Sequence, residues 1–246
     1  MSVNEWLQAD WPAPATVRTL ITTRAGGVSQ GPWAGLNLGD HVGDDPVHVS
    51  ANRARLRSHL PAEPVWLQQV HGTQVLDLAR HTGGTPPEAD ASVAHAPGLV
   101  SVVMTADCLP VLLCDRAGTV VAAAHAGWRG LCNGVIEATV AAMQVARGEV
   151  LAWLGPAIGP DAFEVGAEVR AAFLERDASA ASAFTPIGDD KYLADIYALA
   201  RKRLGRLGVD AVYGGDFCTV IDRERFYSYR RDGTSGRMAS LIWLEA

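Results

Sequence analysis

The sequence predicts an α+β fold in which mixed β-sheets are covered by helices. Short β-branched or apolar runs recur along the chain without the regular alternation of strand and helix that a parallel βαβ sheet requires. The most apolar part, residues 99–125, breaks into three short runs that are typical of buried strands. Two longer segments, 131–146 and 191–207, carry apolar residues at helical spacing and predict covering helices.

The N-terminal half begins with a short β-branched run at 17–23, which predicts a strand. A helix is expected over 46–60, because Asp45 and Pro46 together form a helix-start signal. Two strand-like runs follow within 64–78. This half of the chain therefore contributes strands and one early helix.

The central strands are expected over 99–105, 110–115 and 118–125. Residues 131–146 carry two apolar stripes, which predicts a helix packed between two layers. The remaining expected elements are a buried strand over 150–154, a helix over 191–207, and a hairpin of 226–230 and 238–244 that turns at Asp232-Gly233.

Length and composition favour one folded domain over residues 1–246. A chain of 246 residues that is 48% apolar can bury a large core without covalent cross-links. Its 13 prolines and 25 glycines are spread along the whole length, and we find no repeat or low-complexity tract. Of the four cysteines, only Cys108 and Cys114 are close in sequence, and they lack CxxC spacing. Free thiols in a reducing cytoplasm are therefore expected.

The acidic balance of 27 Asp and Glu against 21 Lys and Arg, a net charge of −6, argues against general nucleic-acid binding. It leaves room for a local basic pocket that binds one phosphate. Residues 1–6 lack the basic and apolar regions of a secretory signal. The longest apolar stretch, 98–114, is interrupted by Asp107 and Pro110, so we expect no membrane partner. The sequence leaves the oligomeric state open.

Three segments share one pattern, in which a predicted strand is next to a metal-type ligand among small residues. The ligands are His71, Cys108 and His125. One thiolate and two imidazoles suit Zn²⁺, and three protein ligands leave a fourth tetrahedral position for water or substrate. No local zinc-finger spacing supports this interpretation, so structural histidines and a small buried cysteine remain the alternative.

Eight strings along the chain resemble, in order, the laccase-domain family, which is also called multicopper polyphenol oxidase, purine nucleoside phosphorylase or peptidoglycan editing factor. The resemblance covers about residues 15–244 and rests on Thr22–Ser29, Leu36–Gly39, Gln69–Gly72, Ala89–Ala91, Thr105–Val111, Ala124–Gly130, Gly155–Gly159 and Ser228–Gly233.

The resemblance implies an α/β/β/α layered sandwich and a zinc site whose ligands match His71, Cys108 and His125, with copper as the less favoured metal. It also implies a purine nucleoside phosphorylase that takes adenosine or inosine with phosphate as its small-molecule partners. Adenosine deaminase and methylthioadenosine phosphorylase activities are implied beside it. A peptidoglycan-precursor editing hydrolase, a copper-dependent polyphenol oxidase and a non-catalytic metal-stabilised interaction module remain alternatives.

The histidine count weighs against the oxidase. A multicopper oxidase needs a three-copper cluster in addition to a His₂Cys site, and such clusters use many imidazoles. This chain has no His-x-His pair, and its five other histidines are scattered, namely His41, His48, His59, His81 and His95. One His₂Cys centre can accept copper, but it does not build a laccase cluster.

Phosphorolysis requires an anion site and groups that orient the nucleoside. Arg24, which precedes Ala25-Gly26-Gly27, is a candidate phosphate ligand and catalytic residue, with a solvated arginine at a glycine turn as the alternative. Asp107 is the second catalytic candidate, as a general base or an orienting group, with a structural strand-end role equally open. The other substrate-binding candidates are Asn37, Gln69, Arg129 and Arg231, and Trp33, Trp128 and Phe163 are candidates to stack on a base.

Overall fold

The computed structural model describes residues 6–245. Residues 1–5, which make up most of the segment that argues against a secretory signal, lie outside the described residues. Among the described residues, no helix combines the length and apolar character needed to cross a bilayer.

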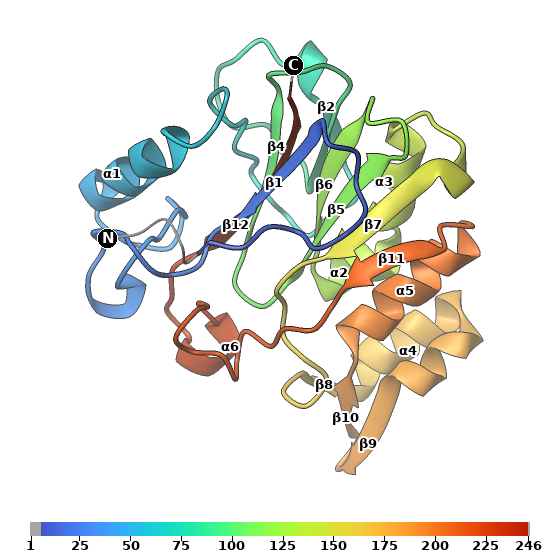
Figure 1. Ribbon diagram of the computed structural model, residues 1–246. Helices are drawn as coiled ribbons and strands as arrows, with labels where there is room; N and C mark the ends of the chain where they lie inside the picture. Colours follow the sequence, from blue (N-terminus) through green and yellow to red (C-terminus); the bar gives the residue numbers. More distant parts are fainter. Residues whose placement is uncertain (1–5, 246) are drawn as a thin grey trace.

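A six-stranded mixed sheet forms the centre of the molecule (Figure 1). Its outer pairs, β11 with β7 and β2 with β3, are parallel, whereas its inner pairs are antiparallel. In spatial order the strands are β11 (Ala211–Gly214), β7 (Val150–Leu154), β5 (Leu109–Asp115), β6 (Val121–Ala126), β3 (Ala91–Ala94) and β2 (Val75–Asp77).

A three-stranded antiparallel sheet packs on one face of the six-stranded sheet. Its strands, in spatial order, are β1 (Val17–Ile21), β12 (Met238–Leu244) and β4 (Val100–Thr105). Alternate residues of β12 face opposite layers, as strand geometry requires. Ile242 shares an apolar cluster with Leu112 of β5, whereas Leu241 shares one with Leu56 of the first helix.

Helices cover both outer faces, which confirms the predicted α/β/β/α sandwich (Figure 1). Helix α1 (Pro46–Arg57) covers the three-stranded sheet. The six-stranded sheet is covered by α2 (Trp128–Asn133), α3 (Val135–Ala142), α4 (Ala167–Arg176) and α5 (Ile196–Arg206). The smaller elements are α6 (Tyr229–Asp232), a sheet of β8 (Glu164–Gly166), β10 (Lys191–Ala194) and β9 (Phe184–Gly188), and short 3₁₀ turns at Gly31–Trp33, Leu78–Arg80, Arg147–Glu149 and Ala178–Ala183.

The predicted central strands, the strands near 17–23, 150–154 and 238–244, and the helix after Asp45 are confirmed. The Asp45 side chain accepts a hydrogen bond from Val47 N and caps that helix. The prediction missed α4 and the strands β3, β8, β9 and β11. Within 64–78, only Val75–Asp77 is a strand, and the rest is mainly irregular chain.

Two predicted helices have wrong boundaries. The segment 131–146 is two helices, because Gly134 adopts a φ of +105° between α2 and α3. In 191–207, Lys191–Ala194 form strand β10, and α5 begins only after Asp195, whose side chain accepts from Ala198 N. Apolar periodicity did not register either break, because a positive-φ glycine and an N-cap are local backbone events.

The predicted C-terminal hairpin is wrong. Strand β12 pairs with β1 and β4, which lie far away in sequence. The segment 226–230 is not a strand, since the Ser228 side chain accepts from Arg231 N and begins α6 at Tyr229. Long-range pairing therefore replaced the local turn that Asp232-Gly233 suggested.

Candidate metal centre and adjoining cavity

Strand register brings Cys108 and His125 to one edge of the central sheet. In the antiparallel β5–β6 pair, Leu109 lies opposite Ala126. Cys108 immediately precedes β5, and continuing the ladder by one residue places it opposite Gly127, just after β6. Two residues 17 positions apart in the sequence are thereby held at neighbouring strand ends.

Asp90 connects this edge to the next strand. It immediately precedes β3, and its backbone carbonyl accepts a 2.7 Å hydrogen bond from His125 N. Its fully buried carboxylate lies 2.8 Å from His125 Nδ1. A carboxylate on one ring nitrogen orients an imidazole and leaves the other nitrogen for a ligand.

The same carboxylate shapes the loop that carries His71. It accepts hydrogen bonds from the backbone N–H groups of Val70 (3.2 Å), His71 (2.9 Å) and Gly72 (2.6 Å). His71 adopts a φ of +60° within this turn, a conformation that is uncommon for residues other than glycine. Asp90 therefore positions both candidate histidines, one through its ring and the other through its backbone.

The potential ligand atoms of His71, Cys108 and His125 all lie within 4.8 Å of one another. Cys108 Sγ is 3.7 Å from His71 Nε2, and the two imidazole rings meet edge to face with centroids 4.8 Å apart. His125 is buried and His71 is exposed, so the group is open on the His71 side. One thiolate and two imidazoles fit a transition metal and leave a coordination position for a ligand.

Gly127 leaves the space that this group needs. A Cβ atom at position 127 would lie 2.7 Å from His71 Cδ2 and 3.0 Å from Cys108 Sγ. Its backbone, with φ −59°, is ordinary for any residue. The glycine is therefore required for close approach of the backbone and not for its conformation.

The Cys108 thiol has a strongly lowered pKa. Burial raises this pKa, but the adjacent His125 and His71 outweigh burial and lower it to about 6. For His125, burial lowers the pKa, whereas the Cys108 thiolate and the Asp90 carboxylate together raise it to about 9. The metal-free site is therefore a thiolate–imidazolium pair at neutral pH, and the thiolate is the form that binds metals.

This pKa predicts the alkylation behaviour of the metal-free protein. After chelation, the reaction of Cys108 with iodoacetamide should rise with pH around a midpoint near 6, because only the thiolate attacks. Burial raises the pKa of Cys114 and of Cys132, so these thiols should react slowly below pH 8. Peptide mass spectrometry measures each rate, and Cys108→Ser should abolish the fast phase. A midpoint near the ordinary thiol value of about 8.5 would contradict the assignment.

A cavity of about 250 Å³ adjoins the group and shares Cys108 with it. Of the predicted site residues, Asp107 and Arg129 line this cavity, as do the predicted aromatic residues Trp128 and Phe163. The complete lining is Ala106, Asp107, Cys108, Trp128, Arg129, Ile158, Phe163, Ile196, Tyr229 and Arg230. Three elements far apart in sequence, namely the β4–β5 turn, the start of α2 and α6, thus enclose one space.

Asp107 is tightly held at the wall of this cavity. Its φ is +91°, and both carboxylate oxygens accept hydrogen bonds, from Thr219 Oγ1 at 2.6 Å and from Arg230 N at 2.7 Å. These contacts tie the turn that carries Cys108 to the first residues of α6. The orienting role that the sequence left open is therefore the one that this geometry favours.

Asn37 and Gln69 are engaged inside the fold. Asn37 is fully buried, and its side chain bonds the backbone of Gly39, the Asp44 carboxylate and Arg237 N. Both amide atoms of Gln69 bond the backbone of Met104, at 2.7 and 2.8 Å. Neither residue lines the cavity beside Cys108, so the structure does not bring these two substrate-binding candidates to it.

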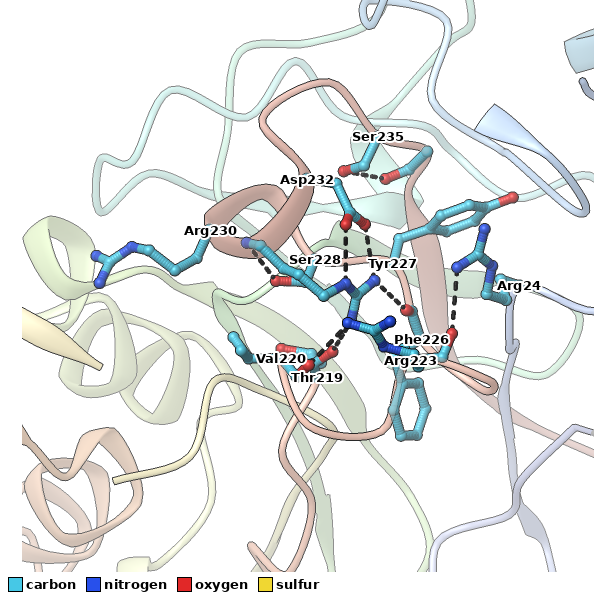
Figure 2. Close-up of polar contacts among 12 residues, drawn as sticks. Arg24, Thr219, Val220, Arg223, Phe226, Tyr227, Ser228, Arg230, Asp232 and Ser235 are labelled. Carbon is cyan, nitrogen blue, oxygen red and sulfur yellow. Dashed lines mark hydrogen bonds and ion pairs between the residues drawn. The ribbon is translucent and has the colours of Figure 1, made fainter. Parts of the chain in front are cut away.

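The other two arginine candidates also lie outside the cavity lining. The Arg231 guanidinium donates hydrogen bonds to the Asp232 carboxylate and to the backbone carbonyls of Thr219, Val220 and Phe226. Arg24 donates to the Arg223 carbonyl at 3.1 Å and lies over the Tyr227 ring. Trp33 is likewise absent from the lining and donates to the Val42 carbonyl. The side chain of Arg230 extends away from Ser228 and Asp232 (Figure 2), and Arg230 lines the cavity instead.

Sequence reasoning missed Asp90, Gly127, Tyr229 and Arg230 as site residues. Asp90 and Gly127 stand inside the family-like strings Ala89–Ala91 and Ala124–Gly130, which was the available signal. Of the two adjacent arginines, Arg231 was the substrate-binding candidate from the sequence, whereas Arg230 is the one that lines the cavity. Among the described residues, His71, Cys108 and His125 are the one group suited to holding a metal.

These observations define a layered α+β protein with a candidate His–Cys–His metal centre beside a small cavity. The chain belongs to the family described as multi-copper polyphenol oxidoreductase laccase, which it matches over residues 18–245.

Full-length relatives carry a different description from that of the family. The chain is 57% identical to "Purine nucleoside phosphorylase PA4543" of Pseudomonas aeruginosa, over 99% of this chain and 100% of that protein. It is 59% identical to "Purine nucleoside phosphorylase YfiH" of Escherichia coli, over 98% and 100%. The crystal structure of Neisseria meningitidis NMB0706 matches with a TM-score of 0.95 and 58% identity, over 98% of this chain and 100% of that one.

Proposed function

We propose that the protein is a zinc-dependent purine nucleoside phosphorylase, which converts adenosine or inosine and orthophosphate to a free base and ribose 1-phosphate. The observation that carries this proposal is that Cys108 belongs both to the candidate metal centre and to the wall of the cavity. The names of the two full-length relatives support it. Because all four cysteines are free thiols, we propose that the reaction takes place in a reducing cytoplasm.

In this reaction a phosphate oxygen forms a bond to ribose C1′ while the C1′–N9 bond breaks and its electron pair leaves with the base, which takes up the proton that the phosphate gives up. Zinc bound by His71, Cys108 and His125 would supply a fixed positive charge and a ligand position beside the cavity. Asp90 fixes the ring of His125 through Nδ1. Trp128 and Phe163 give the cavity aromatic walls against which a planar base can pack.

Asp107 acts in this proposal as a positioning residue. Its carboxylate holds Thr219 and the Arg230 backbone, and these contacts fix the distance between Cys108 and α6. A general base needs an oxygen directed at the proton that it takes. Each Asp107 oxygen already accepts one hydrogen bond, from Thr219 Oγ1 or from Arg230 N, which directs one lone pair of each oxygen at the fold.

The test compares base release from inosine with and without phosphate, in the wild type and in Cys108→Ala. Phosphate should be required in the wild type, and zinc should be found at about one ion per chain. The variant should lose zinc and lose more activity than the roughly 10- to 100-fold that loss of an outer-shell partner costs. Equal base release in both proteins would refute the proposal. Ammonia release from adenosine measures the deaminase activity. Turnover of a serine-containing muramyl precursor would favour the editing hydrolase instead.

A further inference from the structure

Two arginines, Arg129 and Arg230, line the cavity beside Cys108 from different elements. Arg129 belongs to the first turn of α2, and its guanidinium lies 4.5 Å from the centroid of the Trp128 ring. Arg230 belongs to α6, and its guanidinium lies 5.6 Å from the Phe163 ring centroid. Each cation therefore rests on an aromatic wall of the same cavity.

Neither guanidinium is neutralised by a carboxylate. Within residues 6–245, Arg129 has no hydrogen bond or ion pair from its side chain, and Arg230 donates only to the backbone carbonyl of Glu164, at 2.8 Å. The Glu164 carboxylate is paired with Lys191. Both arginines thus keep unused N–H donors at the cavity, a form in which guanidinium groups bind planar or tetrahedral oxyanions.

Asp107 is the one carboxylate in the lining, and it forms no ion pair with either guanidinium. Its carboxylate is occupied by Thr219 Oγ1 and Arg230 N, so it faces the backbone of α6. Two other arginines that the sequence suggested bind other partners. Arg231 donates to backbone carbonyls and to Asp232, and Arg24 donates to the Arg223 carbonyl. Asp107 and Cys108 add negative charge to the same lining, but neither cavity arginine has an ion-pair partner among residues 6–245.

We propose that Arg129 of α2 and Arg230 of α6 form the subsite for the phosphate co-substrate, in the cavity that Cys108 borders. This assignment rests on the proposed phosphorylase function. A tetrahedral oxyanion held there would contact one guanidinium from α2 and one from α6, while the nucleoside occupies the remaining, solvent-open part. At about 250 Å³ the cavity is smaller than typical ligand pockets of roughly 300–1,000 Å³, so the phosphate would fill part of it and the nucleoside would extend toward solvent.

The test uses Arg129→Gln and Arg230→Gln, with Arg55→Gln on α1 as the matched control, because Arg55 is an exposed arginine on the far face of the sandwich. Each cavity variant should raise the KM for phosphate about 10- to 100-fold, the loss expected for one charge-assisted contact. The KM for inosine should change little in either variant, and Arg55→Gln should behave as wild type. Unchanged phosphate KM values in folded Arg129→Gln and Arg230→Gln proteins, as judged by thermal melting, would overturn the subsite.

Calorimetric titration with orthophosphate gives a readout that is independent of turnover. The Kd for orthophosphate should rise in both cavity variants. In Cys108→Ala this Kd should stay close to that of the wild type, since the arginines and not the metal hold the anion. Phosphate binding that is lost in Cys108→Ala and kept in the arginine variants would overturn the proposal. So would binding of adenosine monophosphate without any binding of orthophosphate. If the wild type binds phosphate through these arginines but releases no base, the phosphorylase assignment fails and the binding site stands.

Discussion

Replacing Asp90 by alanine is expected to lower the free energy of unfolding by about 3–5 kcal/mol, the cost of breaking a buried ionic pair, and to abolish tight metal binding. The carboxylate is fully buried and contacts four groups, namely His125 Nδ1 and three successive N–H groups of the His71 loop. Its removal leaves those donors without a partner. Thermal or denaturant melts measure the stability, and metal content measures the site.

The matched control is Asp115→Ala. Asp115 is also buried and accepts three hydrogen bonds from Thr119 and Val120, but at the far end of β5 from Cys108. This variant should lose stability and keep its metal. The stability and metal content of Asp90→Asn should lie between those of the wild type and of Asp90→Ala, because an amide retains one acceptor oxygen. Normal metal content in Asp90→Ala would show that the carboxylate is not what positions the histidines.

Adding one methyl group at Gly127 is expected to cost about 100-fold in activity, the effect of misplacing reacting groups by about 1 Å. The new Cβ would lie 2.7 Å from His71 Cδ2 and 3.0 Å from Cys108 Sγ, so a ligand must move. Because φ at this position is −59°, Gly127→Ala carries no backbone strain, and any loss is due to crowding of the metal ligands. Zinc affinity, measured by competition with a chelator, should fall together with kcat/KM.

Gly205→Ala provides the comparison. Gly205 lies inside α5 with open space around its Cβ position, and an alanine there should raise stability by about 0.5–1 kcal/mol with no change in zinc affinity. If Gly127→Ala binds zinc as tightly as wild type, a glycine is not needed here to make room for the metal ligands. The new Cβ is then accommodated without displacing His71 or Cys108.

The strands and ligand types were predictable because their signals are local. Apolar runs identify the buried strands, and Asp45 before Pro46 identifies the start of α1. Cys108 and His125 stand at or beside the ends of such strands, so they could be proposed as site residues before any fold was known. The family resemblance then supplied the layered arrangement, which the two apolar layers confirm.

The partners of those ligands were not predictable in the same way. Asp90 acts through the register of β3 against β6 and through a loop held by three backbone N–H groups, and no sequence pattern specifies that combination. The choice between Arg230 and Arg231 shows the same limit. Consecutive residues of a helical turn point about 100° apart, so one arginine enters the cavity and the next returns to the backbone.

The sequence by itself determined the α+β class and the residue types of the site, because apolar periodicity and ligand-type residues near strand ends are signals carried by a few neighbouring residues. Only the tertiary structure decided which carboxylate orients the histidines, which glycine makes room for them and which arginines face the cavity. These roles depend on distances between Asp90, Gly127, Arg129 and Arg230 and segments far away in the chain. Such distances are set by strand register and by the packing of α2 and α6, and not by local preference.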